Sequence, residues 1–150
     1  MTDYAAVLAA IRPGAEWSLN DNDYATLEWY SDSPKDLGSF KWKSSLKKPV
    51  VMSEFGAGAK AGVNGRPDER WTEEYQEEVY RRQLDMIERI PFVRGATPWI
   101  LADFRSPLRM NRFQQGYNRK GLVSDQGVRK LAFQVVRDRY EQWRQKWEGK

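Results

Sequence analysis

The chain has 150 residues, of which 25 are Lys or Arg and 21 are Asp or Glu, and its formal net charge at pH 7 is +4. It contains neither Cys nor His, which excludes disulfides, thiolate nucleophiles and His-dependent catalytic triads and disfavours a zinc site. Any catalysis must therefore use carboxylates, amines or hydroxyls, and we expect no metal and no other cofactor.

The first third of the chain predicts one helix and one strand. Apolar residues at helical spacing predict a helix over Thr2–Ile11, which a Pro-Gly pair ends. This stretch carries Asp3 and has no cationic start, so it does not read as a signal peptide. Tyr24–Tyr30 then predicts a strand, whereas Asp36–Lys48 has no clean period.

The middle of the chain opens on a run that predicts a buried strand. Pro49–Met52 is continuously apolar, which is typical of a strand covered on both faces in a parallel sheet. Gly56–Pro67 is rich in Gly and Ala and predicts a long loop. An apolar stripe then predicts a helix over Thr72–Ile90, with Thr72 as its N-cap and Pro91 as its stop.

The last third repeats this order. Trp99–Ala102 is a second apolar run and predicts a strand that ends in Asp103. Arg105–Asn118 predicts a polar loop, and Val128–Trp147 predicts a helix with one apolar face. Strands that alternate with helices favour βα units, so we expect an α/β fold with parallel strands.

Charge and hydropathy restrict the class of partner. The basic residues are mixed with acidic ones along most of the sequence, so we do not expect nucleic-acid binding. The longest apolar stretches are far shorter than a membrane span, so we expect no membrane partner. The sequence therefore predicts a soluble protein, with the cytoplasm as the favoured location.

Three side chains beside the predicted strands are candidates for chemistry. Glu54 follows the first apolar run, where a carboxylate is costly unless it is paired or used, although an ordinary ion pair is the alternative. Asp103 holds the equivalent place after the next run and is a candidate substrate ligand. Its alternative is a structural bond to a loop amide or to Arg105. Trp99 could stack on a sugar ring or could be a core residue.

The segment Tyr117–Gly121 places an amide and two cations beside a glycine. Asn118 and Lys120 in this segment could bind an anionic ligand group, with Lys120 acting as a point charge. A solvated surface loop is the alternative interpretation of the same residues.

Four stretches of the sequence resemble glycoside hydrolase family 2, the β-galactosidase and β-glucuronidase family. In chain order they are KPVVMSEFGAGAKAG, DERWTEEYQEEVYRRQ, RGATPWILADFRSP and YNRKGLVSDQGVRKLAF, and the similar region covers about Asp36 to Tyr140. The resemblance implies that residues 1–150 are one partial domain. This domain would be the C-terminal portion of a catalytic (β/α)8 TIM barrel, with its last three or so βα units.

The resemblance also implies roles for individual residues. Glu54 would be the nucleophile of a retaining exo-β-glycosidase, and Trp99 would line the sugar subsite. Asn118 and Lys120 match the N-x-K motif of the β-glucuronidase branch and would contact the sugar carboxylate. A cation suits a uronic acid, so a β-glucuronide is the favoured substrate.

The chain departs from the family pattern at two places. Tyr24 and Thr26 stand where the family usually has an Asn and a Tyr, and no Asn-Glu pair for the acid/base residue occurs in the chain. Retaining hydrolysis needs two carboxyl groups roughly 5 Å apart, and Asp103 is not expected to replace the missing acid. A full barrel takes roughly 250 residues. We therefore expect exposed sheet edges that bind the missing barrel strands or a second copy.

Two other hypotheses remain open at this point. The chain could be a non-catalytic carbohydrate-binding remnant that keeps Trp99 and Lys120 but performs no chemistry. It could also be a small basic domain that binds nucleic acid, in which case binding would depend steeply on salt concentration.

Overall fold

A computed structural model of the chain describes residues 50–149. The helix predicted over Thr2–Ile11 and the strand predicted over Tyr24–Tyr30 lie outside this range. The described elements form two two-stranded sheets and two helices. In chain order they are β1 (Val50–Met52), α3 (Glu73–Glu88), β2 (Val93–Ala96), β3 (Phe104–Arg105), β4 (Tyr117–Asn118) and α4 (Leu131–Glu148).

Strands β1 and β2 pair in parallel and are joined by α3, so together they form a βαβ unit. Their register aligns Val51 with Gly95 and Met52 with Ala96. The predicted strand over Pro49–Met52 is therefore confirmed at Val50–Met52. The α/β class and the parallel pairing of this unit are confirmed as well.

The strand predicted over Trp99–Ala102 was placed wrongly. The structure has β2 at Val93–Ala96, and the segment Trp99–Ala102 bends instead of extending. Arg94 and Gly95 interrupt the apolar pattern of β2, so hydropathy does not indicate a strand at Val93–Ala96. Pairing with β1 decides where β2 lies, and a proline at position 98, which has no N–H to donate, follows soon after the strand.

The two helices predicted within residues 50–149 are present, with ends set by local chemistry. Thr72 caps α3, because its side chain accepts a hydrogen bond from the Tyr75 N–H at 3.1 Å. Glu73 and Glu74 occupy the first turn, where negative charge is favourable. Helix α3 ends at Glu88, shortly before the predicted proline stop, and α4 begins at Leu131, later than predicted.

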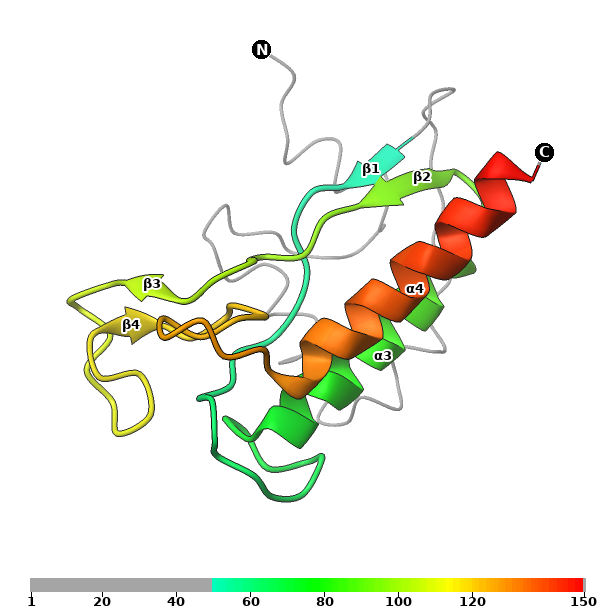
Figure 1. The fold of residues 1–150 in the computed structure, drawn as a ribbon. Coiled ribbons are helices and arrows are strands. Elements are labelled where there is room, and N and C mark those ends of the chain that lie inside the picture. The colour runs from blue at the N-terminus through cyan, green and yellow to red at the C-terminus, as the bar shows by residue number, and fades with distance from the viewer. Residues whose placement is uncertain (1–49, 150) are drawn as a thin grey trace, which may run out of the picture.

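Strands β1 and β2 run in the direction opposite to α3 and α4, and the two helices pack side by side (Figure 1). The loop after β1 and the loop after β2 consequently gather at one end of the molecule, together with the first turns of both helices. In α/β folds this is the end where functional side chains meet.

The core lies between the β1–β2 sheet and the two helices. Its buried apolar side chains come from both layers and from the loops that join them: Met52, Phe55, Tyr80, Leu84, Met86, Ile87, Ala96, Leu122, Ala132 and Val136. Val51, in contrast, is 60% exposed. Among the described residues the strand is therefore covered on one face only, and the expected covering of both faces is not met at Val51.

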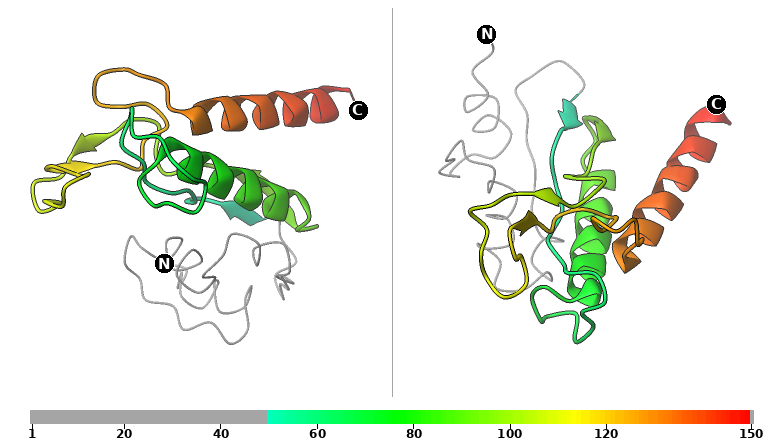
Figure 2. Two further views of the ribbon diagram at one scale, coloured as in Figure 1. Left: turned by 90° about the horizontal axis from the view of Figure 1, so that it is seen from below. Right: turned by 60° about the vertical axis from the view of Figure 1, so that its left-hand side comes forward.

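Strands β3 and β4 lie inside the region predicted as a polar loop. They pair in antiparallel fashion, with Phe104 opposite Asn118 and Arg105 opposite Tyr117. The pair stands apart from the β1–β2 sheet and the helices (Figure 2). Its strands have only two residues each, too few to produce a periodic pattern in the sequence. In the described part of the chain, neither helix is long and apolar enough to cross a membrane.

Candidate active site

Glu54 lies just beyond the C-terminal end of β1 and is partly buried. Its carboxylate has no hydrogen bond or ion pair with any residue in the range 50–149. The turn after it depends on Gly56, whose φ of +131° favours glycine. A β-carbon on residue 56 would lie 2.2 Å from the Tyr80 hydroxyl oxygen, so Tyr80 and the glycine together fix the path of the chain beside Glu54.

Trp99 runs alongside Glu54 because the backbone pairing continues past the ends of the strands. The Thr97 hydroxyl donates to the Ser53 carbonyl at 2.7 Å, and the Trp99 N–H donates to the Phe55 carbonyl at 2.9 Å. Glu54 lies between these two acceptors in the sequence. The Trp99 ring is partly exposed and meets Phe104 edge-on, with ring centroids 6.4 Å apart.

The segment that carries Asn118 and Lys120 lies against the same two loops. The Ile100 N–H donates to the Lys120 carbonyl at 3.2 Å, and the Ala59 N–H donates to the Arg119 carbonyl at 3.0 Å. The backbone therefore brings three separate loops together, and each contributes at least one predicted site residue.

Asn118 and Lys120 are held by a local turn. The Asn118 side-chain oxygen accepts the Lys120 N–H at 3.0 Å, and Asn118 is buried. Its amide Nδ2, a separate donor, makes no hydrogen bond with any described residue. Arg119, between them, is buried and stacks over the Tyr117 ring at 4.4 Å. The arginine of the N-x-K motif thus anchors the segment.

Asp103 is enclosed and makes structural contacts. Its side chain is 0% exposed, and its Oδ1 accepts from Lys130 Nζ at 2.9 Å and from the Gly121 N–H at 2.8 Å. Its Oδ2 accepts from Arg119 at 3.3 Å. The loop amide expected as its structural partner is present, whereas Arg105 instead lies over the Tyr117 ring. Contact between Asp103 and a sugar stays a prediction that these bonds do not favour.

The comparisons with known proteins point to one family. No protein-family model matches the chain. The chain is 37% identical over 99 residues to a β-glucuronidase from Paenibacillus borealis, a match that covers 66% of this chain and 16% of that protein. A solved structure of a family 2 β-galacturonidase from Eisenbergiella tayi, bound to galacturonate, superposes with a TM-score of 0.59 at 30% identity. The chain belongs to glycoside hydrolase family 2.

This family 2 chain spans only a small part of its relatives. The match to the Eisenbergiella structure covers 67% of the chain and 18% of that protein. A solved β-D-glucuronidase from Dictyoglomus thermophilum gives a TM-score of 0.63 at 27% identity, over 76% of the chain and 21% of that protein. The resemblance seen in the four sequence stretches is thus confirmed by sequence identity to curated relatives and by superposition on solved structures.

A buried charge cluster beside the candidate site was not predicted from the sequence. Lys130 is 2% exposed, and Arg119 pairs with both Asp103 and Asp125. Burial lowers the pKa of Lys130, and the bond to Asp103 partly offsets this effect. Burial acts to raise the pKa of Asp125, but hydrogen bonds from Gln126 and Arg119 hold it below its ordinary value. Lys130 directly precedes the first residue of α4, a position at which a lysine is usually at the surface. Nothing in the sequence therefore indicated that this lysine is buried.

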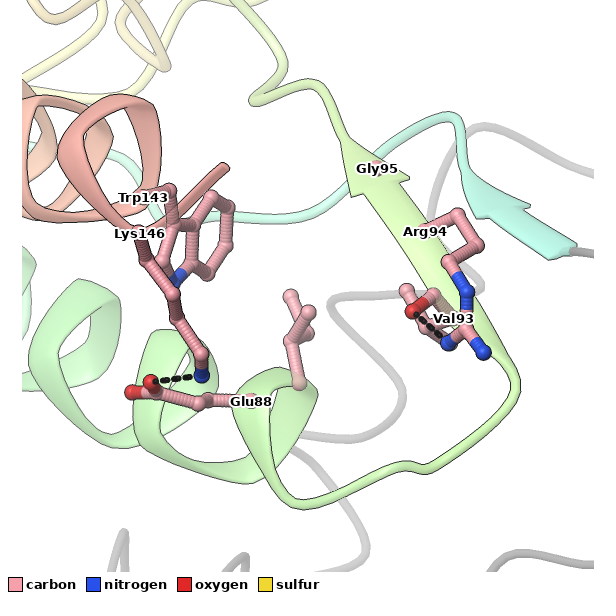
Figure 3. Close-up of a pocket in the computed structure, with 7 residues that line it drawn as sticks. Glu88, Val93, Arg94, Gly95, Trp143 and Lys146 are labelled. Atoms are coloured by element: carbon pink, nitrogen blue, oxygen red, sulfur yellow. Dashed lines mark hydrogen bonds and ion pairs between the residues drawn. The ribbon is translucent and has the colours of Figure 1, made fainter. Parts of the chain in front are cut away.

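Among residues 50–149 two pockets flank α4, and neither of these is lined by a predicted site residue. One, of about 70 Å³, lies between α3, β2 and α4 and is lined by Trp143, with the Glu88–Lys146 ion pair at its wall (Figure 3). It includes Val93, at the start of β2, whereas Glu54 follows the end of β1. The other, of about 500 Å³, lies between the Pro98 turn and α4.

Proposed function

We propose that this chain carries the nucleophile of a retaining β-glycosidase and that Glu54 is that nucleophile. The observation that supports this most is a partly buried carboxylate with no hydrogen bond or ion pair in residues 50–149, beside Trp99. Structural carboxylates at such positions are normally paired, as Asp103 is here. Glu54 would instead be kept available for an anomeric carbon.

The proposed reaction is a double displacement. One Glu54 oxygen attacks the anomeric carbon, the bond from that carbon to the leaving oxygen breaks, and a glycosyl ester forms. Water then attacks the same carbon and gives one proton to the group that had protonated the leaving oxygen. The bond from the anomeric carbon to Glu54 breaks, which releases the sugar and the Glu54 carboxylate. The Trp99 ring would supply a flat apolar surface against the sugar.

The leaving oxygen needs a proton, and we propose that its donor comes from outside the described residues. Such an acid would stand roughly 5 Å from the nucleophile in a retaining enzyme. Asp103 is the carboxylate on the neighbouring loop, but its side chain is fully enclosed by Lys130, Arg119 and the Gly121 N–H. A second carboxylate must therefore be brought to Glu54 by another segment.

We propose a β-linked uronic acid as the sugar, with a β-glucuronide favoured. Lys120 supplies a cation, and Asn118 supplies an amide donor whose orientation is set by its bond to the Lys120 N–H. A carboxylate on the sugar would match both groups. The relatives support this class, since one is a β-glucuronidase and another is a β-galacturonidase bound to galacturonate.

We further propose that the βαβ unit and α4 are the last units of a (β/α)8 barrel and that the partner of the chain is the rest of that barrel. The exposed Val51 on β1 and the two-stranded sheet support this, because such a sheet leaves backbone edges unpaired. Self-association through the same edges is the alternative way to cover them.

The test is covalent labelling of the chain mixed with the complementary N-terminal portion of a related β-glucuronidase. We expect a 2-fluoro-glucuronyl fluoride to add one glycosyl group to the peptide that contains Glu54, as detected by mass spectrometry. Glu54→Gln should remain unlabelled, whereas Glu69→Gln, a change at an exposed carboxylate, should label normally.

Two results would contradict the proposal. A mixture that hydrolyses a glucuronide while Glu54 remains unmodified would remove the nucleophile assignment. Binding of D-glucuronate to the isolated chain that Glu54→Gln leaves unchanged, with no labelling in any mixture, would make the chain a carbohydrate-binding module.

A further inference from the structure

Lys130 is an enclosed lysine with its three hydrogen bonds complete. Its Nζ donates to the Ala59 carbonyl at 2.7 Å, to Asp103 Oδ1 at 2.9 Å and to the Arg119 carbonyl at 3.1 Å. An ammonium group has three N–H donors, so each finds an acceptor. The side chain is 0% exposed, and a buried cation is tolerated only when it is paired in this way.

Each acceptor belongs to a different loop of the candidate site. Ala59 lies on the loop that begins with Glu54, Asp103 lies on the segment that continues from Trp99, and Arg119 stands between Asn118 and Lys120 in the sequence. A single ammonium group therefore joins the loops that carry the proposed nucleophile, the proposed sugar platform and the proposed carboxylate ligands.

Asp103 forms the second half of this junction. Its Oδ1 also accepts the Gly121 N–H at 2.8 Å, and its Oδ2 accepts from Arg119 at 3.3 Å. Lys130 and Asp103 thus both bind the Asn118–Gly121 segment, at Arg119 and at Gly121. The Ala59 N–H donates to the Arg119 carbonyl at 3.0 Å, so this carbonyl meets both the first loop and Lys130.

We infer that Lys130 and Asp103 are positioning residues for the candidate site, which hold its three loops in register without touching the sugar. This inference rests on the proposed function for its catalytic meaning. A pair that served only stability could be replaced by apolar groups of similar volume at little cost. Here the bonds go to the backbone of two loops, and an apolar side chain cannot supply them.

The experiment compares four variants of the full chain with the wild type: Lys130→Met, Asp103→Asn, the double variant, and Lys146→Met. Lys146→Met is the matched control, because Lys146 lies on α4 and pairs only with Glu88 at the surface among the described residues. For each variant, NMR measures the rate of amide hydrogen exchange at individual residues, and calorimetry measures the affinity for D-glucuronate.

We expect Lys130→Met to accelerate exchange at Ala59 and Gly121 while the amides of α3 keep their protection. The affinity for D-glucuronate should fall by about tenfold or more, a loss of about 1.4 kcal/mol. The double variant leaves no unpaired buried charge, so it should fold even if Lys130→Met does not. It should still show the fast loop exchange and the weak binding.

The inference is overturned if loop exchange remains at the wild-type rate in the double variant. It is also overturned if α3 accelerates as much as the loops, since the pair would then act on core stability, or if Lys130→Met binds D-glucuronate as tightly as Lys146→Met. A wild-type chain that binds no D-glucuronate means that the sugar subsite needs the rest of the barrel, and the proposed function is then tested by the labelling of the mixture. Loop exchange then decides alone whether the pair holds the loops.

Discussion

Gly121 approaches Asp103 so closely that a β-carbon on residue 121 would lie 2.2 Å from the Asp103 backbone nitrogen. The Gly121 N–H donates to Asp103 Oδ1 at 2.8 Å across the same contact. Backbone atoms cannot turn aside as the end of a flexible side chain can. The absence of a side chain at position 121 is therefore what allows the two loops to meet.

Gly121→Ala should separate these loops and destabilise the chain by about 1–3 kcal/mol, the usual cost of overpacking. Urea denaturation followed by circular dichroism measures the loss. Gly95→Ala is the matched control, because a β-carbon there would meet only Val51 side-chain atoms at 3.8 Å, an ordinary contact. Equal stabilities for the two variants would refute the close approach.

Thr72→Ala should shorten or fray the start of α3. The Thr72 hydroxyl accepts from the Tyr75 N–H and donates to the Glu69 carbonyl, and the residue is 1% exposed. Loss of such a cap costs about 1 kcal/mol, to be measured as a lower free energy of unfolding. Thr72→Ser keeps the hydroxyl, so it should lose clearly less. A serine variant as unstable as the alanine variant would show that the methyl group matters instead.

Lys120→Met should weaken binding of D-glucuronate but not of a neutral glucoside, because only the uronate carries a charge for the ammonium group to meet. Hydrogen bonds to charged groups contribute about 1.5–3 kcal/mol, so the affinity ratio should change by about tenfold or more. Titration calorimetry with both sugars gives that ratio. Lys60→Met is the control, since Lys60 bonds to Gln115 at the surface. An equal loss for both sugars would argue against a uronate contact.

Tyr140 should make the fold sensitive to alkaline pH. Its hydroxyl donates to the Ala96 carbonyl at 2.6 Å, and burial raises the pKa of the phenol above its ordinary value of 10.0. The folded state therefore holds the proton more tightly than the unfolded state does. The resulting stabilisation is fully present below pH 10.0 and is lost as the pH rises through the higher pKa of the folded state.

Tyr140→Phe tests this by removing the titrating group. The wild type should lose more of its free energy of unfolding than the variant does between neutral pH and pH values above 10.0. Ultraviolet absorbance of the phenolate should show one fewer late-titrating tyrosine in the variant. Identical pH dependence of stability in the two proteins would rule out this role for the Tyr140 hydroxyl.

Local patterns were enough to locate several elements. The apolar run before Glu54 predicted β1, and the Thr72 cap and the apolar stripe predicted α3. The final helix was also predicted, but it starts at Leu131 because residues 128–130 bond to the preceding loop instead. Each success depended on chemistry within one turn or one strand.

The misplaced strand and the unexpected buried lysine both depend on contacts between distant segments. Trp99–Ala102 is as apolar as a strand, yet the segment that pairs with β1 is Val93–Ala96. Lys130 reads as a surface lysine until its acceptors on the loops of Ala59 and Asp103 are known. Which segment pairs, and which charge is buried, depends on neighbours many residues away.

The sequence by itself determined the kinds of residue available for chemistry, the family to which they belong, and the position of Glu54 directly after a strand, because motifs and periodicity are local properties. Only the tertiary structure decided that Trp99 runs beside Glu54 and that Lys130 and Asp103 join the site loops. Those relationships are made by hydrogen bonds between segments far apart in the chain, and a buried charge is stable only where such distant partners meet.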